Sequence, residues 1–147
     1  MTNKINILDD QTPFFIDTGI LISAFSEKEK KKRKEIASMV LCAGIKKAHT
    51  GQKNIIEFID RCPNLKNKDE IVEDMLLVFK ILGYSKETML KAINLAEKHK
   101  IDFKAALIAQ AMIDNQLVII FTENLKDFKK IKEIKAINPF VYFKNKK

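Results

Sequence analysis

A chain of 147 residues, 46% hydrophobic and 31% charged, is long enough to bury one hydrophobic core, and no apolar run in it approaches the roughly 20 residues of a membrane helix. Its two cysteines are too few for a zinc site, and its polar first residues lack the apolar centre of a secretory signal. The net charge of +8 favours a polyanionic partner, and we expect a cytoplasmic protein.

The first predicted strand is a short apolar run, Pro13 to Asp17, that ends in a carboxylate. Apolar residues 20–22 follow as a turn. Ser26, with Glu29 three positions later, matches a capping box, in which each of the two side chains accepts a hydrogen bond from the other residue's backbone N–H. A helix is therefore predicted from about Glu27 to Ala43.

The middle of the chain alternates one weak strand with helical patterns. Lys46 to His49 is a brief possible strand, and Thr50 can cap a helix that ends near Pro63. Two amphipathic segments follow, Ile71 to Leu82 and Ser85 to Lys98, and they are typical of a helical hairpin.

The last third of the chain contains the clearest strand. Asp102 is predicted to cap an apolar helix that runs through Ile113. Leu117 to Phe121 (LVIIF) is β-branched and aromatic throughout, as buried strands are. After a polar turn at residues 122–130, one more strand is expected between Ile134 and Phe143.

Short buried strands that alternate with longer helices predict an α/β domain with a mostly parallel sheet covered on both faces. In such sheets ligands gather beyond the carboxyl ends of the strands. Asp17 and Glu123 lie at such ends, and Glu57 lies on a helix between them in sequence. Clustered carboxylates suit hard cations such as Mg²⁺ or Mn²⁺, which can activate water against a phosphoryl group. A glycine-rich phosphate loop is absent, since the chain has only four glycines.

Three segments resemble the motifs of PIN domains. FFIDTGILISAF resembles the opening signature of that family, NIIEF its helical Asn-Glu motif, and TENLKDF its late acidic element. The resemblance extends from about Pro13 to Pro139. It implies a single PIN-like domain over residues 1–147, with its core at about 13–143, and a three-layer α/β/α sandwich whose sheet has the strand order 3-2-1-4-5. Many members of the family are metal-dependent ribonucleases, including VapC-like toxins that pair with antitoxins and commonly form homodimers.

The resemblance also places the family's acidic metal site on this chain. The first two acids fall on Asp17 and Glu57, and the fourth position falls on Asn124, next to Glu123 and Asp127. The resemblance implies a Mg or Mn ion held by Asp17, Glu57, Glu123 and Asp127, with Thr18, Gly19 and Thr122 in supporting positions.

Two positions depart from the family pattern. The third acid belongs to a motif resembling I-x-F-x-D-A-L-I, and Ile101 to Ile108 reads IDFKAALI, so that Ala105 stands where the carboxylate belongs. Gly19 stands where the family usually has Asn. Asp102 is either a substitute ligand or the cap of its helix, and helix capping is the commoner role for such a residue. The sequence leaves open whether Ala105 is natural or engineered.

Two functions remain open at this point. One is a VapC-like ribonuclease, or an inactive form of one, and the other is a degenerate PIN domain that binds RNA or protein without cleavage. In both cases the basic run is expected to contact RNA phosphates through Lys28, Lys30, Lys31, Lys32, Arg33 and Lys34. The segment from Ile71 to Lys98 offers enough apolar positions for a homodimer interface.

Overall fold

The computed structural model describes residue 8 and residues 10–144 of the chain. Five strands form one sheet in the order β3-β2-β1-β4-β5, and all neighbouring strands are parallel. The predicted α/β class and the strand order 3-2-1-4-5 are therefore confirmed. The strands are β1 (Phe14–Ile16), β2 (Ala48–Gly51), β3 (Lys80–Leu82), β4 (Ile119–Phe121) and β5 (Lys135–Ile137).

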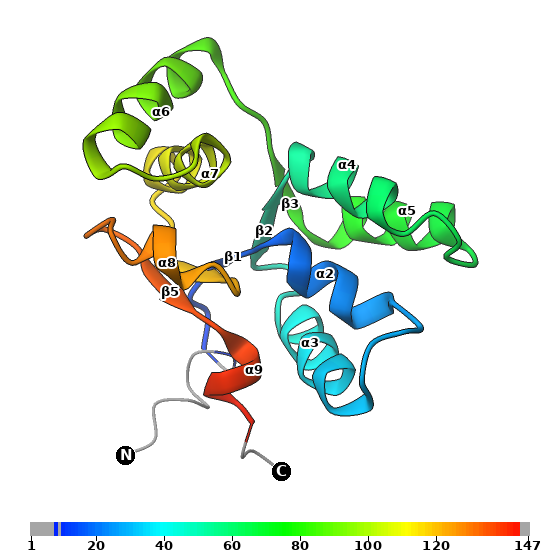
Figure 1. The fold of residues 1–147 in the computed structure, drawn as a ribbon. Helices are drawn as coiled ribbons and strands as arrows, with labels where there is room; N and C mark the ends of the chain where they lie inside the picture. The colour runs from blue at the N-terminus through cyan, green and yellow to red at the C-terminus, as the bar shows by residue number, and fades with distance from the viewer. Residues whose placement is uncertain (1–7, 9, 145–147) are drawn as a thin grey trace.

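Helices cover both faces of this sheet. Figure 1 shows α2 to α5 on one side and α6 and α7 on the other, which gives three layers. The helices are α2 (Thr18–Phe25), α3 (Lys31–Ala43), α4 (Gln52–Arg61), α5 (Lys68–Val78), α6 (Lys86–His99), α7 (Phe103–Asp114), α8 (Leu125–Phe128) and α9 (Pro139–Tyr142). Within the described part of the chain, no helix is long and apolar enough to cross a membrane.

The central strand β1 holds the two cores together. Phe14 and Ile16 pack into the cluster on the side of α2 to α5, whereas Phe15 packs into the cluster that contains α7. This alternation follows from the period of two along a strand. Phe14 also meets Phe121 of β4 edge to face, with ring centroids 4.8 Å apart. The predicted parallel pairing of these two strands is confirmed, in the register Phe14 with Ile119.

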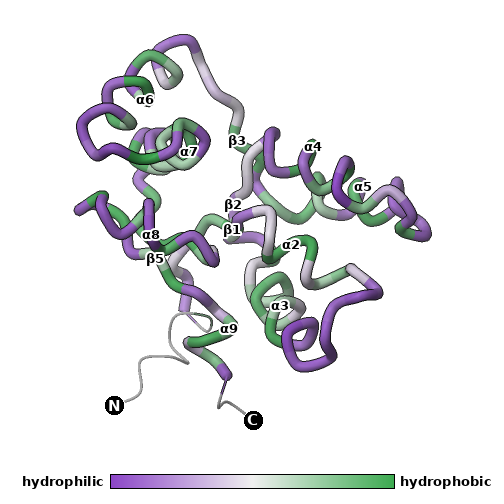
Figure 2. Tube along the Cα trace, viewed as in Figure 1, coloured by the Kyte–Doolittle hydropathy of each residue, from purple (hydrophilic) through white to green (hydrophobic). Residues whose placement is uncertain are grey.

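The region after β1 differs from the prediction. Residues 18–25 form helix α2 rather than a turn, because Asp17 caps the helix by accepting a hydrogen bond from the Thr18 amide at 2.9 Å. The capping box at Ser26 and Glu29 does not form. Ser26 accepts from the Lys28 amide in a turn, and α3 begins only at Lys31. Figure 2 shows this connection as a hydrophilic stretch between two partly apolar helices.

The predicted helical hairpin is wrong. The segment Ile71 to Leu82 does not stay helical, because α5 ends at Val78 and residues 80–82 form the edge strand β3. That strand separates α5 from α6, and α6 packs against α7 on the opposite face of the sheet (Figure 1). Asp102 caps α7 as predicted, by accepting from the Lys104 amide, and Ser85 caps α6 by accepting from the Thr88 amide.

Two further boundaries shift by a few residues. The strand expected at Lys46 to His49 lies at Ala48–Gly51, so the following helix is capped by Gly51 rather than by Thr50. The Thr50 hydroxyl instead donates to the Ile16 carbonyl oxygen at 2.8 Å, which ties β2 to β1. The predicted extent of the domain, residues 1–147, includes ends that lie outside the described residues.

Candidate functional site

A pocket of about 210 Å³ opens beyond the carboxyl ends of β1 and β4, where the sheet is expected to bind ligands. It brings together five of the predicted positions: Asp17, Thr18, Gly19, Glu57 and Asn124. Ala105 lies in its wall, as the resemblance implied. The pocket is also lined by Lys53, Asn54, Arg61, Asp102, Lys104, Ile108 and Phe128. We call this cavity the acid pocket.

Three hydrogen-bond donors orient the side chain of Asp17, which directly follows β1. Its Oδ1 accepts from the Thr18 amide at 2.9 Å and from Asn54 Nδ2 at 3.2 Å, and its Oδ2 accepts from Thr122 Oγ1 at 2.6 Å. Burial raises the pKa of Asp17 above its usual value, and the hydrogen bonds from Thr122, Thr18 and Asn54 only partly oppose that rise. The carboxylate is therefore oriented by the protein and carries a desolvation cost.

Glu57 reaches the same pocket from α4. Its Oε1 accepts from Thr18 Oγ1 at 2.7 Å, and Thr18 Oγ1 in turn accepts from Asn54 Nδ2 at 2.9 Å. The other oxygen, Oε2, forms an ion pair with Lys104 Nζ at 3.3 Å. Thr18 and Asn54 thus connect the two carboxylates of Asp17 and Glu57 through one hydrogen-bond network.

Ala105 stands at the position of the missing third acid, and Asp102 is the residue considered as its substitute. Ala105 is 4% exposed in α7, and its methyl group provides no ligand. Asp102 accepts a hydrogen bond from the Lys104 amide at 3.1 Å as the cap of the same helix. Of the two roles considered for Asp102, the structure therefore shows the capping one.

Glu123 and Asp127 do not line the acid pocket, and both have other partners. Glu123 Oε2 pairs with Arg33 Nη2 at 3.1 Å. Asn124 caps α8 by accepting from the Asp127 amide at 3.2 Å, and Asp127 Oδ2 accepts from Asn124 Nδ2 at 3.3 Å. The predicted assignment of Glu123 and Asp127 to a shared metal stays a prediction.

Thr122 and Gly19 occupy supporting positions of different kinds. Thr122 is completely buried, and its hydroxyl donates to Asp17 while accepting from the Asn124 amide at 2.9 Å. A Cβ on Gly19 would meet Glu123 Oε1 at 3.7 Å, an ordinary contact, so the backbone there has room for a larger residue.

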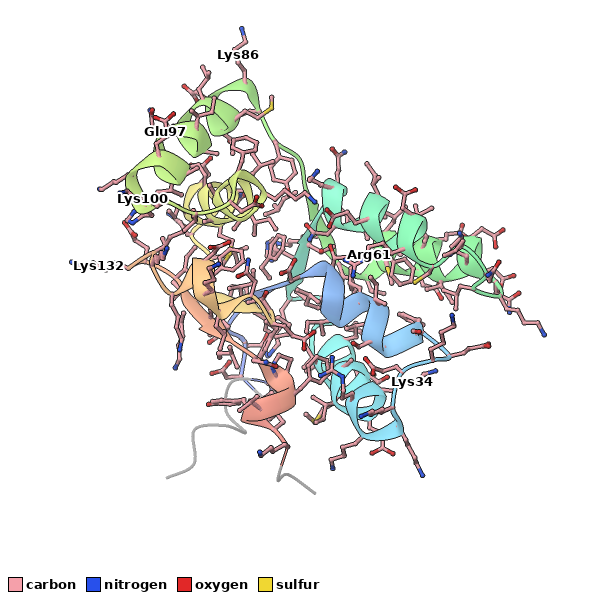
Figure 3. The ribbon with its side chains drawn as sticks, viewed as in Figure 1. Lys34, Arg61, Lys86, Glu97, Lys100 and Lys132 are labelled. Carbon is pink, nitrogen blue, oxygen red and sulfur yellow. The ribbon has the colours of Figure 1, made fainter. Side chains whose placement is uncertain are left out.

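Cations line the acid pocket as well as acids, which the sequence did not indicate. Lys53 and Arg61 come from α4 and Lys104 from α7. Lys104 is paired with Glu57, whereas neither Lys53 nor Arg61 takes part in an ion pair among the described residues. Figure 3 labels Arg61 at the end of α4. The acid pocket therefore presents two unpaired positive charges to a ligand.

The basic run lies in the connection between α2 and α3 and in the first turn of α3. Lys28, Lys30 and Lys31 are exposed. Arg33 differs from them, because it pairs with Glu29 at 3.2 Å and with Glu123 at 3.1 Å and lies over the Phe140 ring at 3.8 Å. Its charge is already neutralised by these two carboxylates, which disfavours it as a phosphate contact.

A divalent metal ion fits the acid pocket poorly. Among the described residues, no group of three or more His, Cys, Asp and Glu side chains is placed to hold a metal ion. The carboxylate oxygens of Asp17 and Glu57 already accept hydrogen bonds. The ammonium of Lys104 also supplies, beside Glu57, the positive charge that a metal ion would otherwise supply. Mg²⁺ takes oxygen ligands in nearly octahedral geometry. Here one of the two carboxylates, Glu57, is already paired with Lys104, and no third carboxylate is placed beside them among the described residues.

Comparison with known proteins adds a family and a set of similar folds. A model of the family described as "PIN domain" matches residues 14–134. No match was found among curated proteins. A toxin-antitoxin complex from Klebsiella pneumoniae is similar with a TM-score of 0.69 and 22% identity over 87% of this chain and 98% of that one.

Two further solved structures have the same fold. VapC20 of Mycobacterium tuberculosis, described as a Sarcin-Ricin loop cleaving toxin, has a TM-score of 0.64 and 12% identity over 77% of this chain and 92% of its own. VapBC-1 of nontypeable Haemophilus influenzae has a TM-score of 0.63 and 16% identity over 87% of this chain and 98% of its own. At these identities the likeness concerns the fold.

Proposed function

The chain belongs to the PIN domain family, and from that premise we propose that it binds the phosphate backbone of RNA at the acid pocket without hydrolysing it. Of the two functions that the sequence left open, this is the degenerate, non-catalytic one. It is the function that the geometry of the acid pocket supports better.

One observation carries this proposal. The acids of the pocket already have partners, since Asp17 has three donors, Glu57 has Thr18 and Lys104, and Asp102 has the Lys104 amide. Lys53 and Arg61 have no carboxylate partner among the described residues. A ligand that enters the pocket therefore finds two cations that no carboxylate neutralises, and phosphate is the group that such cations bind.

The exposed surface of the chain carries further positive charge. Lys28 and Lys30 are exposed in the α2–α3 connection and Lys31 is exposed at the start of α3, in a chain whose net charge is +8. Neutralisation of phosphates by several lysines releases counterions, so that binding depends steeply on salt. RNA is the polyanion we propose, because VapC20, which has the same fold, is described as a toxin that cleaves the Sarcin-Ricin loop.

A metal-dependent ribonuclease of the VapC toxin type, with Mg or Mn as cofactor, is the second candidate. The observation that favours it is that Asp17 and Glu57, which match the first two acids of the family, line the same pocket. Loss of the third carboxylate at Ala105 weakens this candidate, because each anionic ligand contributes to metal affinity.

We also propose two protein partners. The first is an antitoxin, because similar folds occur in a toxin-antitoxin complex and in VapBC assemblies. An apolar groove of about 290 Å³ between α2, α3 and α5 offers it a surface. A second copy of the chain is the other, and α6 exposes Met89, Leu90 and Ile93 for such contact.

The experiment that tests RNA binding is a titration of fluorescent single-stranded RNA in EDTA, at several salt concentrations. Arg61→Gln should weaken binding and reduce the slope of log affinity against log salt by about 0.7, the value for one phosphate contact on a single strand. The matched control is Lys86→Gln, which changes a lysine that Figure 3 shows pointing outward from α6, far from the acid pocket. Equal affinities and slopes for the two variants would contradict the proposal.

A further inference from the structure

Two buried polar atoms beside the acid pocket have no hydrogen-bond partner among the described residues. They are Oδ1 of Asn54 and the hydroxyl oxygen of Tyr84. Asn54 is 1% exposed, and Tyr84 is partly buried against the core on the α7 side of the sheet. Buried polar groups without a partner are rare in native proteins, so two of them in one place require an explanation.

Gly51 shows that these two atoms point to the same place. A Cβ built on Gly51 would lie 2.2 Å from Tyr84 Oη and 2.7 Å from Asn54 Oδ1. Both atoms therefore border the space beside the Gly51 backbone, which only the absence of a side chain leaves open. They are close enough to share a hydrogen bond through one water molecule.

The chemistry of the two groups is complementary. Asn54 Oδ1 can only accept a hydrogen bond, and the Tyr84 hydroxyl can donate one. Burial, together with the negative charges of Asp17 and Glu57, raises the pKa of Tyr84 to about 12. The hydroxyl consequently keeps its proton and remains a donor at neutral pH.

We propose that Tyr84 is a positioning residue of the acid pocket, whose hydroxyl donates to a water molecule in the space beside Gly51, and that this water donates in turn to Asn54 Oδ1. An asparagine amide can rotate by half a turn, which exchanges its oxygen and its nitrogen. Only one orientation directs Nδ2 at Asp17 Oδ1 and Thr18 Oγ1, and a donor at Oδ1 selects that orientation.

The consequence reaches both carboxylates. In the opposite orientation Asn54 would direct its oxygen at Asp17, where two acceptors repel each other, and Thr18 would lose a donor. Thr18 in turn holds Glu57 through its hydroxyl. Tyr84 therefore sets the direction of the two acids without touching a ligand.

The test is NMR of protein labelled with ¹⁵N-asparagine, with Tyr84→Phe and Tyr142→Phe compared. The Asn54 side-chain amide protons should exchange with solvent at least ~10-fold faster in Tyr84→Phe and unchanged in Tyr142→Phe. The side-chain amide of Asn115, whose Nδ2 donates to the Ala111 carbonyl oxygen at 2.8 Å, serves as the internal reference. A role in packing alone would speed exchange at Asn115 and Asn54 alike, and that result, or unchanged exchange at Asn54, would overturn the proposal.

A second measurement covers the case in which Tyr84→Phe is too unstable for NMR. Gly51→Ala should lower the midpoint of urea unfolding when Tyr84 is present, because the added Cβ would collide with the Tyr84 hydroxyl. The same substitution should lower the midpoint less in a Tyr84→Phe background. Equal losses in both backgrounds would mean that the hydroxyl does not occupy this space. Neither measurement involves RNA, so both would still test the role of Tyr84 if the chain proved not to bind RNA.

Discussion

Ala105→Asp is the substitution that distinguishes a lost metal site from one that never depended on this position. Ala105 is 4% exposed in the wall of the acid pocket, so a carboxylate there is placed with Asp17 and Glu57 and away from bulk water. Burial of an unsatisfied polar group costs about 1–3 kcal/mol. Since a domain of this size loses roughly 3–4 °C of melting temperature per kcal/mol, a fall of about 3–12 °C is expected without metal.

Mg²⁺ should reverse that loss only in the substituted protein. A ligand present at 100 times its Kd stabilises the folded state by about 2.7 kcal/mol, which corresponds to a rise of about 8–11 °C. The unsubstituted chain lacks the third carboxylate and pairs Glu57 with Lys104, so its melting temperature should rise by less than ~1 °C.

The assay is thermal unfolding in EDTA and in Mg²⁺, for the unsubstituted chain, Ala105→Asp and Ala105→Asn. The asparagine variant is the matched control, because Asn has nearly the same volume as Asp and no charge. If the unsubstituted chain gains as much stability from Mg²⁺ as Ala105→Asp does, the missing carboxylate is not what limits metal binding. The same holds if Mg²⁺ stabilises the two variants equally.

Three other predictions concern charge. Because the pKa of Asp17 is raised in the folded state, its contribution to stability is greatest below about pH 3.9 and is lost as pH rises through the folded-state pKa. Asp17→Asn should therefore make the free energy of urea unfolding vary less between pH 4 and 7. An unchanged pH dependence would show that Asp17 does not contribute in this way. Arg33→Gln removes two ion pairs and a ring contact and should cost about 1–2 kcal/mol in the same assay, against less than ~0.5 kcal/mol for the exposed Lys31→Gln. Replacement of Lys28, Lys30 and Lys31 together by Gln should reduce the slope of log RNA affinity against log salt by about 2, since each phosphate contact on a single strand contributes about 0.7. An unchanged slope would mean that these lysines do not contact RNA.

Strands β1 and β4 were predictable because their residues are apolar throughout and end at polar turns. Strand β3 was not, because Ile81 and Leu82 continue the apolar pattern of α5 and are only partly buried, while Lys80 is exposed at the edge of the sheet. Helix α2 was missed for a related reason. It is apolar on almost every side and buried, so the sequence has no amphipathic period to indicate a helix there.

The acid pocket was predictable only in part. Asp17 and Glu57 were found from the family resemblance, and their common pocket follows from the strand order of the sheet. Lys53 and Arg61 resemble other surface cations in the sequence, and only the direction of α4 turns them toward the pocket. Tyr84 follows β3, so its position beside Asn54 could not be inferred while β3 was assigned to a helix.

Binding without cleavage is tested most directly by incubation of the unsubstituted chain with single-stranded RNA in EDTA and in Mn²⁺, with RNA binding and RNA cleavage followed in the same samples. We expect equal affinity in the two buffers and intact RNA in both, because the cations Lys53 and Arg61 bind phosphate without a metal ion. Cleavage that requires Mn²⁺ and disappears in Asp17→Asn, with binding lost in EDTA, would contradict this account and establish the metal-dependent ribonuclease in its place.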